Sequence, residues 1–211
     1  MVFLAFAEEN DAMHAGLLWK GGVLGFSIAA PVGPIGALAI GRTLRHGRGA
    51  GLATGLGAAA ADAVYGAAAA MGLSAVAVRA ASVVPRLRWA GGAFLVGYGI
   101  RLLLARGRGR RSGRVAPGGG AFFSAFLLTL ANPMTILAFA AMLGSFGATT
   151  GAAGTLLVSG VFLGSMAWWA LLSSVVAAAA WKLDGRWLSA LDLVCGCALA
   201  AFGLYALCGR K

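Results

Sequence analysis

The chain has 211 residues, of which 60% are hydrophobic and 11% are charged, with a mean hydropathy of +0.87. Soluble domains carry about 25% charged residues, so this composition favours a membrane protein over a soluble one. The formal net charge of +11 does not indicate a nucleic-acid-binding protein. The arginines stand in short clusters between long apolar runs, and they form no basic face interleaved with aromatic residues.

The apolar runs predict the membrane spans. Met1 to Ala7 are apolar but lack a basic leader and run into acidic residues, so we expect no cleaved signal peptide. Crossing about 30 Å of hydrocarbon takes roughly 20 residues. By that measure the chain has about six candidate spans, near Gly21–Gly41, Ala50–Leu73, Trp89–Leu104, Phe122–Leu143, Thr155–Ala180 and Trp187–Cys208.

Lysine and arginine counts in the connections predict the orientation. One set of connections holds ten: Arg42, Arg45, Arg48, Arg106, Arg108, Arg110, Arg111, Arg114, Lys182 and Arg186. The other set holds six: Lys20, Arg79, Arg86, Arg88, Arg210 and Lys211. We therefore expect both termini to be extracytoplasmic and the arginine-rich central connection to be cytoplasmic.

An internal repeat divides the chain, because three features recur in the same order. They are Pro34 and Pro133, 99 residues apart; Gly57-x4-Asp62-x2-Tyr65 and Gly160-x4-Ser165-x2-Trp168, 103 apart; and Gly92-x2-Leu95-x3-Gly99 and Gly196-x2-Leu199-x3-Gly203, 104 apart. A unit with an odd number of spans is inserted upside down the second time. The pattern therefore predicts two inverted three-helix repeats, an architecture of secondary transporters.

This reading predicts an all-α membrane protein with the following organisation. Residues 1–20 form an N-terminal extracytoplasmic segment and residues 21–105 the first three-helix repeat. Residues 106–120 form a cytoplasmic linker rich in Gly and Arg, interpreted as flexible, and residues 121–208 form the second repeat. Residues 209–211 are a short tail.

The first helix of each predicted repeat is broken by proline. Pro31, Gly33 and Pro34 interrupt the first span, and Asn132 and Pro133 interrupt the fourth. Proline removes a backbone donor and clashes with the preceding turn. The freed carbonyls need partners, which in hydrocarbon are protein groups, trapped water or a ligand. A kink that only serves packing is the alternative, but two breaks at equivalent positions favour a substrate site between them.

Asp62 is the only acidic residue deep in a predicted span. A carboxylate at that depth costs at least about 2.5 kcal/mol and must face the bundle interior or water. Asp62 is therefore a candidate proton carrier, a partner for a substrate ammonium group, or both in turn; a purely structural carboxylic acid is the alternative. Tyr65, one turn later, and Trp168, at the equivalent place in the second half, are candidate walls of the site; plain packing of these aromatic side chains is the alternative.

Other chemistries find no support in the residue pattern. Cys195, Cys197 and Cys208 form no C-x-x-C pair, and His14 and His46 lie outside the predicted spans without partners at ligand spacing. We therefore expect no metal and no cofactor. An intramembrane enzyme or thiol-disulfide carrier and a non-transporting scaffold remain as alternatives to a transporter.

Several segments together resemble a known family. The run from Gly25 to Pro34, the stretch Arg42 to Gly57 and the following Asp62 are similar to the start of lysine-exporter (LysE/RhtB-type) amino-acid exporters. The run from Trp89 to Gly99 looks like their third hydrophobic segment. Asn132-Pro133 is similar to the Asn-Pro-Lys motif that opens their second half.

The resemblance implies an inner-membrane exporter of amino acids or related small amphiphiles that is driven by the proton motive force. Its partners would be the solute, protons and the lipid bilayer, with no nucleic acid, and a homodimer is left open. The positions carried over are Pro31, Gly33, Pro34, Asp62, Asn132 and Pro133. Met134 stands where the family motif has lysine, so basic amino acids are not to be assumed as substrates.

Overall fold

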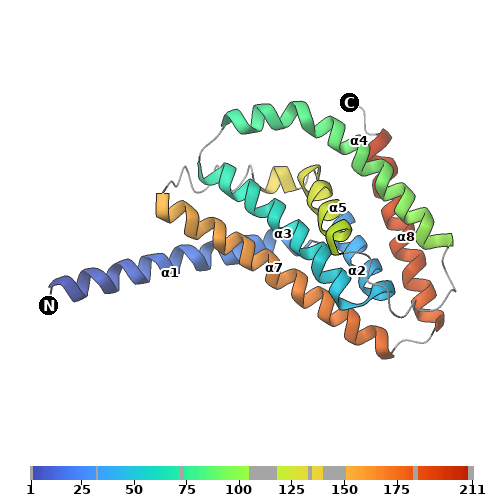
Figure 1. Cartoon of the computed structure of the whole chain (residues 1–211), viewed down its shortest axis with the longest axis horizontal. Coiled ribbons are helices and arrows are strands. Elements are labelled where there is room, and N and C mark those ends of the chain that lie inside the picture. The colour runs from blue at the N-terminus through green and yellow to red at the C-terminus, as the bar shows by residue number, and fades with distance from the viewer. Residues whose placement is uncertain are drawn as a thin grey trace.

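The computed structural model describes residues 2–31, 33–71, 74–104, 118–132, 135–139, 151–182 and 185–208. These residues are helical apart from short connections, which confirms the all-α prediction (Figure 1). The helices are α1 (Val2–Ala29), α2 (Pro34–His46), α3 (Arg48–Ala70), α4 (Ser74–Leu104), α5 (Gly118–Leu130), α7 (Gly151–Lys182) and α8 (Gly185–Cys208). A short helical stretch over residues 135–139 follows α5.

Several helices have the length and composition of membrane spans. Within the described residues, Gly151–Ala180 of α7 and Ser189–Cys208 of α8 are long and apolar enough to cross a membrane. A bent pair, Met13–Ala29 with Pro34–His46, passes the same criterion as one broken span. Trp89–Leu104 and Gly119–Leu130 are shorter apolar helices. The chain is thus a helical membrane protein, while the full set of six spans stays a prediction.

The break of the first span lies where the prolines predict it. α1 ends at Ala29 and α2 begins at Pro34, and the two parts of the bent pair meet at 81°. Pro34 fits the first position of α2 because an N–H there has no helical partner to lose. The carbonyl of Gly33 accepts the N–H of Ala37 at 3.0 Å, which closes the first turn of α2.

The ends of the first span differ from the prediction. The span was expected over Gly21–Gly41, whereas α1 is helical from Val2 and α2 continues to His46. Only Gly47 separates α2 from α3, and its φ of 87° is a conformation that glycine adopts without a steric penalty. Arg42 and Arg45, which were expected in a connection, therefore lie on a helix.

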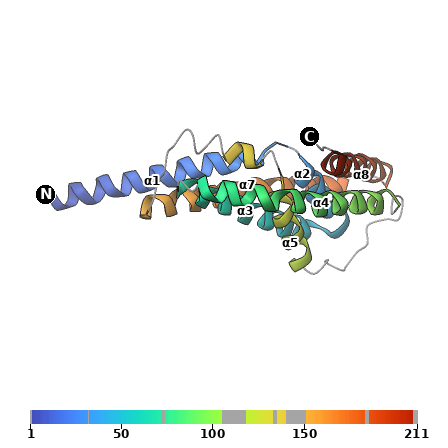
Figure 2. The same ribbon diagram turned by 90° about the horizontal axis from the view of Figure 1, so that it is seen from above.

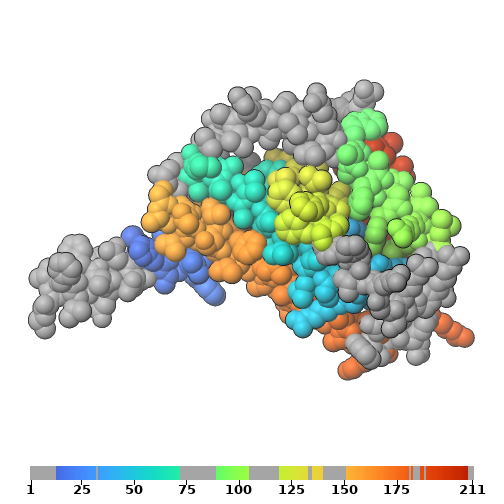
Figure 3. All heavy atoms as spheres, in the orientation of Figure 1, coloured from blue at the N-terminus to red at the C-terminus, as the bar shows by residue number. Residues whose placement is uncertain are grey.

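The helices form one bundle in which α3 is central. α1 packs along α7, α3 packs against both α7 and α5, and α4 packs along α8. α2 crosses between α3, α7 and α8, and the start of α1 extends beyond the bundle (Figures 1 and 2). In the space-filling view, α5 lies between α3 and α4 on the face toward the viewer (Figure 3). The core gathers residues from all seven labelled helices, with Ala29 as the contribution of α1.

Glycines set the distance between α4 and α8. A Cβ atom at Gly99 would lie 2.7 Å from the carbonyl oxygen of Gly196, and one at Gly203 would lie 2.7 Å from that of Gly92. Any larger residue at either position would push the backbones apart. Small residues that admit such close approach are typical of helix packing within membranes.

Candidate functional site

Asp62 lies inside the bundle, at the interface of α3 and α7. Its side chain is 3% exposed, and its Oδ2 accepts a hydrogen bond from Oγ of Ser165 at 2.7 Å. Ser165 is fully buried, and residues one turn to either side of it, Val161 and Trp169, are buried and apolar. The buried acid that the sequence indicated thus contacts Ser165, the residue that the predicted repeat makes equivalent to it.

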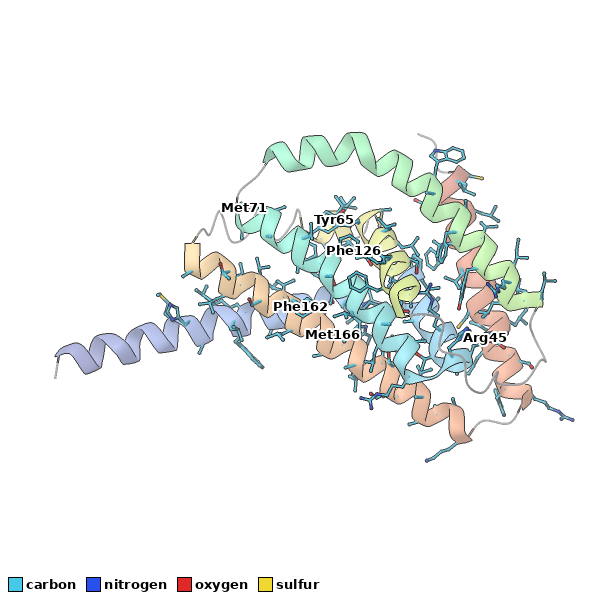
Figure 4. The ribbon with its side chains drawn as sticks, viewed as in Figure 1. Arg45, Tyr65, Met71, Phe126, Phe162 and Met166 are labelled. Carbon is cyan, nitrogen blue, oxygen red and sulfur yellow. The ribbon has the colours of Figure 1, made fainter. Side chains whose placement is uncertain are left out.

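No cation stands beside this carboxyl group in the part of the chain that the structure describes. The ion pair found there joins Arg45 of α2 to Asp192 of α8 at 2.8 Å and lies elsewhere (Figure 4). Buried charges are ordinarily paired or neutralised. A proton or a cationic group of a ligand can balance the negative charge of Asp62, whereas the neutral hydroxyl of Ser165 cannot.

Tyr65 lies one turn beyond Asp62 and faces another helix. Its hydroxyl donates to the carbonyl oxygen of Leu130 at the end of α5, and its ring stacks on Phe139 with centroids 5.7 Å apart (Figure 4). Carbonyls in the last turn of a helix have no helical donor. Tyr65 therefore satisfies a backbone group at the break of the second half, which is a positioning role.

Asn132 marks the break of the second half. Its backbone N–H donates to the carbonyl of Thr129 at 3.1 Å, and its own carbonyl accepts the N–H of Ile136 at 3.2 Å. A helix thus stops and a short helical stretch starts at this residue. Pro133 and Met134 lie outside the described residues, so the predicted part of Pro133 in the site stays a prediction.

The remaining predicted residues lie on α7 and at the bend between α1 and α2. The ring of Trp168 packs edge-on against Phe26 of α1, with centroids 5.3 Å apart, and so faces the α1–α7 interface. Pro31 is exposed, and Gly33 and Pro34 are half-buried at the bend between α1 and α2. Ala29 and Ile35, which flank the bend, belong to the same core as Ala58 and Ala59 of α3.

Arg42 is a buried polar residue that sequence reasoning placed in a loop. Its side chain is 7% exposed, and its Nη1 donates to Oγ1 of Thr54 and to the carbonyl of Ala121, both at 3.0 Å. Its Nη2 donates to Oγ of Ser124 at 2.8 Å, and its guanidinium carbon lies 5.4 Å from the centroid of the Tyr98 ring. The only signal in the sequence is the pair of hydroxyl residues, Thr54 and Ser124, in apolar segments.

Closely packed apolar helices, a proline-broken span and a buried carboxyl group with no cation beside it among the described residues are typical of membrane transporters. Residues 26–210 match the family described as LysE type translocator. The chain belongs to this family, whose members are transporters and not enzymes. The resemblance seen in the sequence is thereby confirmed.

A curated relative agrees with this assignment. The "Putative amino acid efflux protein YcgF" of Bacillus subtilis (strain 168) is 33% identical over 197 residues, which covers 87% of this chain and 91% of the relative. No solved structure matches the chain.

Proposed function

We propose that the chain exports amino acids or related small amphiphilic metabolites across the cytoplasmic membrane, by proton antiport and alternating access. The observation that carries the proposal is the buried Asp62, held only by Ser165 among the described side chains. Membership of the LysE type translocator family supports export, and the printed name of the Bacillus relative supports amino acids as the solute class.

The packing of α4 on α8 supports the inverted repeat. The sequence makes Gly92 equivalent to Gly196 and Gly99 equivalent to Gly203. In the structure Gly99 contacts Gly196, and Gly203 contacts Gly92. A two-fold axis produces this reciprocal pairing, because position i of one copy then meets position j of the other and the reverse.

The helices around α3 and α7 follow the same pattern. Gly57 of α3 packs against the carbonyl of Phe122 on α5, and the equivalent Gly160 of α7 packs against Gly21 on α1. Asp62 and Ser165 are themselves equivalent residues and contact each other. Residues that meet their own equivalents lie on a two-fold axis, so this pair would mark the interface between the two repeats.

A site between inverted repeats suits alternating access, in which the repeats rock about a fixed centre. Asp62 is the single carboxyl group at that centre among the described residues. It would take up a proton from the extracytoplasmic side and release it to the cytoplasm as solute leaves. Protonation of Asp62 and binding of the solute would exclude each other, which gives exchange of a proton for a solute molecule.

The test of export uses the full chain reconstituted in lipid vesicles. Vesicles are loaded with a mixture of the twenty L-amino acids, and the amount that leaves is followed for each, against vesicles without protein. The proposal expects protein-dependent efflux of at least one amino acid. Efflux of none, from vesicles whose protein is folded and inserted, would favour a non-transporting scaffold or another solute class.

A further inference from the structure

Among the described residues, the partners of the Arg42 guanidinium are neutral. Its hydrogen bonds go to hydroxyl and carbonyl oxygens on α3 and α5, and its central carbon lies 5.4 Å from the centroid of the Tyr98 ring on α4. Two carboxyl groups are present among the described side chains. Asp192 pairs with Arg45, and Asp62 accepts from Ser165. Arg42 thus has hydrogen bonds but no negative charge to balance its own in that part of the chain.

A buried charge without a counter-ion is costly, and hydrogen bonds to neutral groups offset only part of the cost. A residue with only a packing role could be apolar at lower cost. The guanidinium also stands where α2, α3, α4 and α5 meet, which places it inside the bundle and not at a helix end facing solvent.

The guanidinium of Arg42 and the carboxyl group of Asp62 lie at different positions along α3. Arg42 binds Thr54, and Thr54 precedes Asp62 by eight residues, which corresponds to about 12 Å along a helix axis. The ammonium and carboxylate groups of an α-amino acid sit on one carbon atom. At that spacing, one α-amino acid would contact only one of the two residues through these two groups.

We propose that Arg42 binds the carboxylate of the exported solute, at a position separate from Asp62, so that transport selects solutes with a free carboxylate. This inference rests on the proposed amino-acid export. The planar fork of an arginine matches the two oxygens of a carboxylate, and the pairing is stronger than one between neutral groups. Asp62 is then left to the proton, because the solute ammonium lies out of its reach while the carboxylate is bound.

The low exposure of Arg42 agrees with this role. At 7% exposed, the guanidinium is reached only when the helices around it separate. Hydroxyl and carbonyl oxygens of Thr54, Ser124 and Ala121 hold it in the closed bundle. A carboxylate would displace one or more of these weaker, neutral acceptors and would add the missing negative charge.

The test compares amino acids with their α-carboxamides, which keep the ammonium group and lose the negative charge. Thermal unfolding of the purified full chain is measured against each of the twenty L-amino acids and its α-carboxamide. For any amino acid that protects the parent, the half-saturating concentration should be about tenfold or more lower than for its amide. Arg42→Gln should bring that ratio to about one. Arg42→Lys keeps the charge without the fork and should give an intermediate ratio.

Arg48→Gln is the matched control, because Arg48 is an exposed arginine at the start of α3; it should keep the parent ratio. If Arg42→Gln shows the same ratio of half-saturating concentrations as the parent, the inference is overturned. If that variant does not fold, Arg42→Lys decides, and an unchanged ratio there would overturn it too. If no amino acid protects the parent and none leaves the loaded vesicles, the proposal of amino-acid export itself fails. If amino acids protect the parent but their half-saturating concentrations equal those of the amides, the proposed role of Arg42 is wrong and the proposal of amino-acid export stands.

Discussion

Asp62 and Ser165 show what a single polar contact does at the interface of α3 and α7. The hydroxyl of Ser165 is a buried donor to a buried carboxyl group. Loss of a hydrogen bond that leaves a buried partner unsatisfied costs about 1–3 kcal/mol. The contact thus holds the two central helices together as well as positioning the carboxyl group.

Ser165→Ala should therefore lower the free energy of unfolding by about 1 kcal/mol, measured by chemical unfolding in mixed micelles. Ser174→Ala is the control on the same helix, because Ser174 donates to the carbonyl of Ala170 in its own helix. The control should stay within about 0.5 kcal/mol of the parent. If the two substitutions change the free energy of unfolding equally, the proposed contribution of the Ser165–Asp62 hydrogen bond to stability is wrong.

The hydrogen bond from the Tyr65 hydroxyl to the carbonyl of Leu130 is a second polar contact near Asp62 that can be tested. Tyr65→Phe keeps the stack on Phe139 but removes the donor to the carbonyl of Leu130. It should destabilise the protein by about 1 kcal/mol in the same measurement. Tyr205, which is 69% exposed on α8, provides the control, and Tyr205→Phe should leave stability unchanged. A neutral Tyr65→Phe would mean that the freed carbonyl has another partner.

The sequence identified the buried acid and its counterpart but not all of the polar centre. Asp62 was selected because it is the only acidic residue deep in a predicted span, and Ser165 was noted only as its equivalent in the second predicted repeat. Arg42 was missed because an arginine near the end of an apolar run has the same pattern whether it faces a loop or the interior. The bond of Tyr65 to Leu130 joins residues 65 positions apart, and no local pattern predicts such a contact.

At the scale of the elements, glycine decides how closely the helices pack. Gly99 and Gly97 lie on the same helix, α4, but only Gly99 meets another backbone. A Cβ atom at Gly99 would lie 2.7 Å from the carbonyl of Gly196, whereas one at Gly97 has nothing within 4 Å. Substitutions at these two positions therefore distinguish the effect of helix propensity from the effect of helix packing on stability.

Gly99→Ala should destabilise the protein by about 1–3 kcal/mol, since α4 and α8 must move apart to admit the methyl group. Gly97→Ala should be neutral or stabilising by about 0.5–1 kcal/mol, because alanine is the better helix former. Thermal unfolding of the two variants beside the parent checks both signs. Destabilisation by Gly97→Ala to the same extent would contradict the packing of α4 on α8.

The break of the first span could be predicted because proline acts locally, and the structure confirms it between Ala29 and Pro34. The length of α2 could not, because its last residues are polar and read as a connection. Trp168 was expected as a wall of the site from its equivalence to Tyr65; its ring packs on Phe26, and its part in the site stays a prediction. Which face a side chain takes depends on the neighbouring helix, and the spacing along the chain does not contain that information.

At the scale of the whole molecule, the lysine and arginine counts predict the orientation. They predict both termini outside the cytoplasm and residues 106–120 inside it. Alkaline phosphatase fused after Lys211 should therefore be active, and a fluorescent protein at the same place should be dark. The same two fusions within residues 106–120 should give the reverse result. Matching signals at both places would contradict the inverted arrangement of the two halves.

The proposal as a whole depends on Asp62 as the coupling residue. The direct measurement is amino-acid efflux from vesicles that contain the full chain, with and without an acidic external medium. The parent should release solute faster when the outside is acidic, and Asp62→Asn, which keeps an acceptor for Ser165, should lose that acceleration. Asp192→Asn, at the other described carboxyl group, should keep it. An Asp62→Asn variant that responds to the pH gradient as the parent does would contradict proton coupling through this residue.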